Sequence, residues 1–246
     1  MTSQQAWALH RITSYLGGLP DQPRVIPGTA PEPITLPDRE PLCLQLDDVL
    51  SQRGSCRRFS GGALRLQTVA TLLSAAYGCG RPVNFGHAGW PARPVPSAGA
   101  KYPLELHLVV RAVDCLPAGS YRYLPMEHAL APTGPSVSFT FLADIFFRQP
   151  YLTPAAAIVV IAGNFEKTTT RYGDRGYRYV LFEAGHVAQN MLLAATVLGA
   201  GSLSLGGFLD DTLAATLQVG PQVAPLYGVA LGPPADHDRD VLRQID

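Results

Sequence analysis

The chain is poor in cysteine, in long apolar runs and in net charge, and each lack argues against a class of protein. Its four cysteines contain no CxxC pair, which argues against a zinc site and a disulfide framework. No apolar run approaches the roughly 18 residues that a membrane span needs. The first residues also lack the basic and apolar regions of a signal peptide. We therefore expect a soluble, cytoplasmic protein with reduced thiols.

Motifs of the common nucleotide and hydrolase sites are also missing. The sequence contains no GxGxxG, GxxxxGK[ST] or GxSxG segment, so a Rossmann site, a P-loop and a serine hydrolase are not supported. The 19 Lys and Arg residues balance 19 Asp and Glu residues, which disfavours binding to nucleic acid or an anionic membrane. What remains is a chain of 246 residues, 47% of them hydrophobic, which is long enough to bury a large core in one domain.

The longest periodic segment spans residues 176–198 and predicts a single long helix. It contains no proline, its apolar residues recur every three or four positions, and Gly199 and Gly201 supply a stop. Its second half is apolar on nearly every face, which favours a partner subunit as the cover. In its first half, four polar residues share one face that we expect to be internal but wet: Tyr179, Glu183, His186 and Asn190.

Glu183 and His186 have the spacing of one half of a di-iron helix motif. Such a site needs a second Glu-x-x-His and further glutamates on other helices. The sequence does not supply them, so we expect no metal. His186 has two interpretations, a hydrogen-bonded core histidine or a catalytic residue, and the first is favoured.

The remaining segments predict a series of helices and strands. Apolar periodicity predicts helices at residues 6–19, 42–52, 66–77 and 139–147, a helix to Gln218 capped by Asp210 or Asp211, and strands at 104–113, 121–123, 155–162, 202–205 and 226–231. A hairpin return is expected near residues 129–130. The proline-rich residues 20–41 form an extended arm of the kind that wraps a neighbouring subunit. We therefore divide the chain into an N-terminal helix and arm, 1–41, and a main domain, 42–246.

Two loops and a glycine pair carry candidate binding residues. Arg53, Ser55 and Arg57 alternate, so in an extended loop they point the same way and can surround a phosphate; the alternative is a solvated basic turn. Small residues at 97–100 come directly before a predicted strand and invite a ligand. Gly206-Gly207 lets the backbone approach a planar cofactor.

Taken in order, the motifs resemble a known family. RGSCRRF, PSAGAKYPLE, AGSYRYLPMEHAL, RYGDRGYRYVLFEAGHVAQN and GGF follow one another along the chain. Between about residues 44 and 232 this order is similar to the FMN-dependent nitroreductases, specifically the SagB-like dehydrogenase branch that includes the azoline oxidases. The resemblance implies an α+β nitroreductase-like fold, with a central, mostly antiparallel sheet flanked by helices. It also implies a homodimer with the long helix in its core and two FMN molecules at the subunit interface.

The resemblance further implies which residues meet the flavin. Those expected at its phosphate and ribityl chain are Arg53, Ser55 and Arg57, with Arg239 or Arg243 completing the phosphate site. Those expected to contact the flavin across the interface are Pro96, Ser97, Ala98 and Gly99. Those expected against the isoalloxazine are Gly206 and Gly207.

Azoline oxidases also carry a Lys-Tyr pair just before the long helix, which is thought to remove a proton. That position reads Arg171-Tyr172 in this sequence. Arginine stays protonated in proteins and cannot be a general base, so Tyr172 is the candidate base and Arg171 or Arg175 a cation that favours its phenolate. A second pair, Lys101-Tyr102, offers a lysine from another direction.

The function that this resemblance implies is oxidation of a thiazoline or oxazoline to the azole, in a peptide or carrier-bound intermediate. A base takes the acidic ring proton, hydride passes to the flavin, and dioxygen reoxidises it. A cyclodehydratase or a peptide synthetase would be the partner enzyme. Two alternatives stay open: another FMN-dependent dehydrogenase or NAD(P)H-driven nitro or quinone reductase on the same scaffold, and a flavin-free scaffolding subunit that docks through its proline arm.

Overall fold

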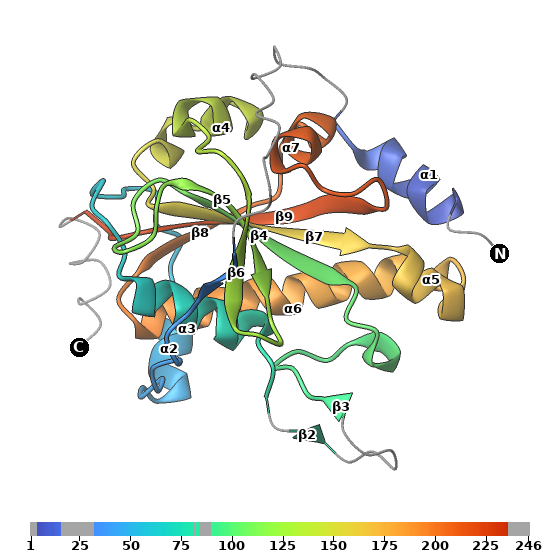
Figure 1. Ribbon diagram of the computed structural model, residues 1–246, viewed down its shortest axis with the longest axis horizontal. Coiled ribbons are helices and arrows are strands. Elements are labelled where there is room, and N and C mark those ends of the chain that lie inside the picture. The colour runs from blue at the N-terminus through green and yellow to red at the C-terminus, as the bar shows by residue number, and fades with distance from the viewer. Residues whose placement is uncertain (1–3, 16–31, 81, 84–89, 236–246) are drawn as a thin grey trace.

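A seven-stranded sheet forms the centre of the computed structural model, which describes the chain except residues 1–3, 16–31, 81, 84–89 and 236–246 (Figure 1). Its strand order is β1-β6-β5-β4-β7-β9-β8, and each neighbouring pair is antiparallel. The predicted α+β fold with a mostly antiparallel sheet is therefore confirmed. The strands are β1 (Ile34–Thr35), β4 (Leu104–Val110), β5 (Gly119–Leu124), β6 (Ala129–Gly134), β7 (Ala157–Asn164), β8 (Gly201–Leu205) and β9 (Val223–Gly232), and a separate hairpin joins β2 (Pro82–Val83) to β3 (Trp90–Pro91).

Helices cover both faces of the sheet. They are α1 (Gln4–Thr13), α2 (Leu46–Gln52), α3 (Leu66–Tyr77), α4 (Phe139–Ile145), α5 (Glu166–Tyr172), α6 (Arg175–Val197) and α7 (Asp210–Leu217), with 3₁₀ turns η1 (Ala98–Ala100) and η2 (Pro150–Leu152). Figure 1 shows α3 and α6 on one side of the sheet and α4 and α7 on the other. Because both faces are covered, β7 is apolar at nearly every position, as its uninterrupted apolar run predicts.

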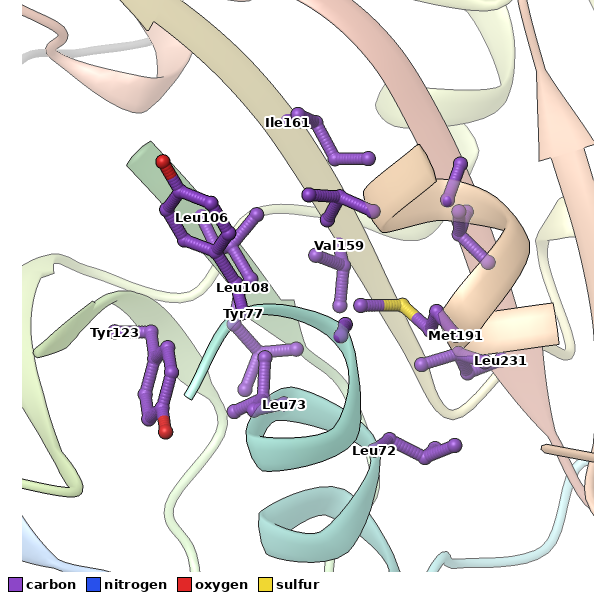
Figure 2. Packing of buried hydrophobic residues seen from close by; sticks show 14 of the residues in the cluster. Leu72, Leu73, Tyr77, Leu106, Leu108, Tyr123, Val159, Ile161, Met191 and Leu231 are labelled. Carbon is purple, nitrogen blue, oxygen red and sulfur yellow. The ribbon is translucent and has the colours of Figure 1, made fainter. Parts of the chain in front are cut away.

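The larger core lies between the sheet and the pair α3 and α6. Figure 2 shows Tyr77, Leu106, Leu108, Val159 and Met191 packed together there. The leucines of β4 face this core because side chains alternate along a strand. Fully burying one such side chain contributes about 1.5–3 kcal/mol, so this layer fixes α6 firmly against the sheet.

One expectation for α6 is wrong and another stays a prediction. Met191 and Ala195 in its second half are buried in the core cluster of their own subunit, but Leu193 and Val197 are only partly buried, so cover of these by a partner subunit remains untested. Its exposed apolar residues lie further forward, with Leu181 37% and Phe182 57% exposed. The polar face is not uniformly internal, since Glu183 is buried but His186 is exposed. Tertiary contacts, which periodicity does not report, decide which side of a helix faces inward.

The N-terminal helix is shorter than predicted and packs on its own chain. Arg11 Nη1 donates to Asp211 Oδ1 at 2.6 Å, and the Tyr15 amide donates to Asp210 Oδ2 at 2.9 Å. Both aspartates therefore hold the N-terminal segment and do not cap α7, whose N-cap residue is Leu209. The predicted cap is wrong because a carboxylate in a first turn can serve another element instead.

The described part of the proline arm, residues 32–41, also lies on its own subunit. It adds β1 to the sheet edge next to β6, and the Glu40 amide donates to Thr71 Oγ1 at 2.9 Å. Residues 20–31 lie outside the described residues, so the arm's contact with a neighbour stays a prediction, as does the division at residue 41. None of the four cysteines, which all lie in the described ranges, forms a disulfide. None of the described helices has the length and apolarity needed to cross a membrane.

Candidate functional site

The predicted site residues form two groups at opposite ends of the sheet. The loop of Arg53 to Arg57 joins the start of β8, where the Cys56 amide donates to the Ser202 carbonyl at 2.9 Å. The loop that contains Gly99 leads into the start of β4, which lies level with the start of β9. Since β8 begins opposite the end of β9, the groups are separated by most of that strand, about 25 Å at the usual rise per residue.

The arginine loop borders a small cavity. This cavity of about 140 Å³ is lined by Ser55, by its two neighbours in the loop and by the backbone between Gly199 and Ser202. In the described part of the chain, neither Arg53 nor Arg57 forms an ion pair. Unneutralised guanidinium groups beside a hydroxyl can bind an anion through charge-assisted hydrogen bonds. The cavity suits a phosphate group and is too small for a whole nucleotide.

Gly99 and Tyr172 meet at the other end of the sheet. Gly99 has a φ of 60°, and a Cβ added to it would lie 2.6 Å from Tyr172 Oη. Arg171 lies beside the same ring, with its Cζ 5.5 Å from the ring centroid, and Tyr179 packs edge-on against it at 5.3 Å. The structure therefore brings Gly99 together with Arg171 and Tyr172, which lie 72 and 73 positions further along the chain. It also places a guanidinium beside the phenol.

A helix that the sequence analysis missed positions this pair. Arg171 and Tyr172 end α5, which precedes the long helix, and Gly173 stops it with a φ of 55°. The three consecutive threonines of α5 are poor helix formers, so periodicity gave no signal. The available signal was Asn164, whose Oδ1 accepts the Glu166 amide at 3.0 Å before the first turn, together with the glycine at the end.

The second predicted pair has a different environment. Lys101 is exposed, and Tyr102 is tied to its own loop, because its amide donates to Ser97 Oγ at 2.9 Å and its Oη accepts the Arg93 amide at 3.3 Å. The Arg93 guanidinium lies over the rings of Tyr77 and Tyr102, at 4.2 and 4.6 Å from their centroids. Tyr102 therefore has contacts typical of a residue that stabilises the loop.

Glu183 is a site residue that the sequence analysis considered only as half of a metal motif. It is 2% exposed, and burial raises the pKa of its carboxyl group, partly offset by hydrogen bonds from Ser97 and Tyr77. Burial and the nearby Glu183 charge raise the pKa of the Tyr77 phenol as well. Among the described residues, no group of three or more His, Cys, Asp and Glu could hold a metal ion, so the carboxylate serves hydrogen bonding.

Gly206 and Gly207 follow β8, and aromatic side chains of the same chain lie next to both of them. A Cβ at Gly207 would lie 3.0 Å from the Phe147 ring, and a Cβ at Gly206 would lie 3.7 Å from the Tyr227 ring. The close approach that the glycines permit is therefore to Phe147 within the chain. Their contact with an isoalloxazine stays a prediction, and Arg239 and Arg243 lie outside the described residues.

A larger cavity lies away from both groups. It measures about 580 Å³ between α1, α7 and the start of β9, and its lining includes Trp7, His10 and Asp210. Burial lowers the pKa of His10 despite the nearby Asp210. No predicted flavin or proton-transfer residue lines this cavity, so the size of a cavity alone does not identify the chemical site here.

Comparison with known proteins identifies relatives of the whole sheet domain. Residues 50–233 match the nitroreductase family. A protein of Methanocaldococcus jannaschii that is named as a nitroreductase is 40% identical over 186 residues, which cover 76% of this chain and 89% of that protein.

The chain is also similar to a peptide-processing protein. The Microcin B17-processing protein McbC of Escherichia coli is 30% identical over 174 residues, covering 66% of this chain and 60% of McbC. A chain of the solved E. coli microcin synthetase McbBCD complex with truncated pro-MccB17 bound has a TM-score of 0.68 and 22% identity, covering 96% of this chain and 95% of that one. At that identity the structural match shows the shared fold alone.

Proposed function

Because the chain belongs to the nitroreductase family, in its SagB-like branch, we propose that it is an FMN-dependent oxidase that converts a thiazoline or oxazoline into the azole. Its substrate is a peptide or a carrier-bound intermediate, supplied by a cyclodehydratase or a peptide synthetase. The similarity to McbC, whose name assigns it to microcin B17 processing, supports this choice. The observation that carries the proposal is the contact of Tyr172 with Gly99 and Arg171 at one end of the sheet.

The flavin phosphate binds at the arginine loop in this proposal. Ser55 supplies a hydroxyl to the lining of the cavity of about 140 Å³. Arg53 and Arg57, two positions before and after it in the loop, supply the charge that a phosphate dianion needs. The bound flavin supplies a two-electron acceptor for the hydride and returns the electrons to dioxygen. The arginine loop takes no part in the chemical step; it holds and orients the cofactor.

A homodimer would complete the site, because the cavity in one subunit holds only the phosphate end. The exposed apolar residues Leu181 and Phe182 on α6 favour an interface there, since such side chains lose contact with water on association. An obligate interface of this kind buries more than about 2,000 Å². A two-fold axis near α6 would then bring the arginine loop of one subunit toward the Gly99 and Tyr172 group of its partner.

Tyr172 acts as the general base in this reaction. As a phenolate it takes the acidic proton from the azoline ring carbon onto Oη, while the hydride leaves from the neighbouring ring atom. Arg171 lies beside this ring, with its Cζ 5.5 Å from the ring centroid, and helps to hold the tyrosine in position for this step. Gly99 keeps space free beside Oη, since any larger residue would displace the phenol. We also propose a cytoplasmic location, where the four cysteine thiols stay reduced.

Two measurements on the purified protein test the proposal. Addition of FMN should give a retained flavin spectrum, and an azoline peptide under air should gain azole absorbance. A colourless protein that takes up no flavin would instead favour the scaffolding alternative. Rapid bleaching of the flavin by NAD(P)H, without azole formation, would favour a nitro or quinone reductase, which the relative named as a nitroreductase makes the second candidate.

A further inference from the structure

Glu183 is a buried acid whose carboxylate contacts hydroxyl groups rather than a cation among the described residues. It projects from α6 into the larger core and is 2% exposed, and no ion pair of this carboxylate occurs within the described ranges. Burying a carboxylate is costly unless hydrogen bonds replace its hydration. An apolar residue would pack there at a lower cost, so the acid has a role beyond packing.

The carboxylate holds both ends of the loop before β4. Tyr77 Oη donates to Glu183 Oε1 at 2.8 Å and accepts the Leu104 amide at 3.2 Å. The Ser97 side chain lies close enough to Glu183 to lower the pKa of its carboxyl group, and Ser97 Oγ accepts the Tyr102 amide at 2.9 Å. One acid therefore fixes the loop at Ser97 and at Leu104 through two intermediary hydroxyl groups. Figure 2 shows Tyr77 at the end of α3, beside Leu106.

The loop between these two points needs such support. Gly99, Ala100 and Tyr102 have positive φ values of 60°, 52° and 45°, and two of them are not glycine. Residues with a Cβ disfavour this region, and they remain in it only when the surrounding contacts impose it. The loop would relax if its end points were released, and Gly99 would move relative to the Tyr172 hydroxyl beside it.

We propose that Glu183 is the positioning residue of the site, which fixes the loop 97–104 and thereby the contact between Gly99 and Tyr172. This inference rests on the proposed function for its catalytic meaning, but the loop contact itself does not. Glu183 touches no substrate in this scheme and acts through Ser97 and Tyr77. Arg93, which lies over the Tyr77 ring, and Lys167 are the cations whose fields favour its charged form.

The first test measures the loop directly and needs neither flavin nor substrate. In Glu183→Gln, one of the two hydroxyl donors loses its acceptor because an amide offers a single oxygen. Hydrogen–deuterium exchange of the peptide covering residues 97–104 should become about 5- to 10-fold faster, as expected for one lost hydrogen bond. Glu166→Gln makes the same chemical change at an exposed position and should leave that exchange unchanged. Unchanged exchange in Glu183→Gln would overturn the proposal.

The second test asks whether the loop matters for turnover. With saturating FMN, Glu183→Gln should reduce kcat about tenfold with little change in KM, because a misplaced base affects the chemical step. Ser97→Ala combined with Glu183→Gln should be no slower than the worse single variant, since both act on one connection. Fully additive losses, or fast exchange with an unchanged kcat, would contradict the positioning role.

A third variant covers the case in which Glu183→Gln does not fold. Tyr77→Phe removes a single hydroxyl and should speed exchange at the Leu104 end of the same peptide, while unchanged exchange there would count against the network. An inactive or flavin-free wild-type protein would refute the proposed function, and the exchange measurements would still decide whether Glu183 holds the loop.

Discussion

The two ends of the sheet differ in the charge of their polar groups and in whether partners within the chain satisfy them. At the start of β8, the loop that carries Arg53 and Arg57 borders a small cavity, and neither arginine has a carboxylate partner among the described residues. At the start of β4, by contrast, the buried Glu183 satisfies Ser97 and Tyr77 within the chain. The first end has unused charge and can receive an anion from outside. At the second end, the polar groups bind one another and hold one loop and one tyrosine in place.

This difference predicts that substitutions at the two ends will fail in different ways. A change at the arginine loop should weaken cofactor retention and leave the chemistry of loaded protein intact, because its groups bind the phosphate far from the reacting atoms. A change at Tyr172 or Arg171, which are not expected to bind the flavin, should slow the chemical step and leave cofactor retention intact. The predictions below separate the two ends on this basis.

Tyr172→Phe should have the largest effect. The rate of azole formation should fall by ~10²–10⁴ because proton transfer is lost, while the aromatic ring and its packing remain. Azole absorbance under air measures the rate, and the flavin spectrum and light scattering measure retention and assembly. A rate close to that of the wild type would remove Tyr172 from the mechanism and direct attention to Lys101-Tyr102.

Arg57→Ala should weaken FMN retention by ~1.5–3 kcal/mol, the usual contribution of a hydrogen bond to a charged group, or roughly 10- to 150-fold in Kd. Fluorescence titration of flavin-free protein measures the Kd. Turnover at saturating FMN should stay near the wild-type value. Arg122→Ala, which removes an arginine from β5 at an exposed position, is the control and should retain flavin normally.

Arg171→Met should slow azole formation roughly two- to fivefold, because the guanidinium 5.5 Å from the Tyr172 ring centroid is lost. Arg171→Lys keeps the charge and should retain most of the activity. The rates of azole formation of the two variants decide the question. Equal rates would indicate that Arg171 only fixes the turn before α6.

A mixed dimer gives the smallest change and tests whether the two ends meet between subunits. One subunit carries Arg57→Ala and the other Tyr172→Phe. Activity is measured with FMN above the wild-type Kd but well below that of Arg57→Ala, so that sites with the altered loop stay empty. If each site takes its arginine loop from one subunit and its tyrosine from the partner, one site has both native residues and activity should be about half that of the wild type. If each site lies within one subunit, one site lacks flavin and the other lacks its base, so the mixed dimer should be nearly inactive.

Local periodicity predicted correctly the elements that are surrounded by apolar side chains. The continuous apolar run of β7 and the helix α3, which begins and ends at Leu66 and Tyr77 as expected, follow from side chains that face apolar neighbours on nearly all sides. Periodicity failed for α5, whose threonines pack in a buried turn, and for His186, which faces outward on α6. In both cases a contact with another element, and not local preference, decides the outcome.

The sequence by itself determined the family and the chemical types at each end: the arginines on either side of Cys56, the small residues before β4, and the tyrosine before the long helix. Only the tertiary structure decided how these pieces meet. The order β4-β7-β9-β8 joins strands that are distant in sequence, and this order places the arginine loop and Tyr172 at opposite ends. It also brings Glu183 from α6 against Ser97 and Tyr77, because hydrogen bonds over such separations depend on packing that no local sequence pattern encodes.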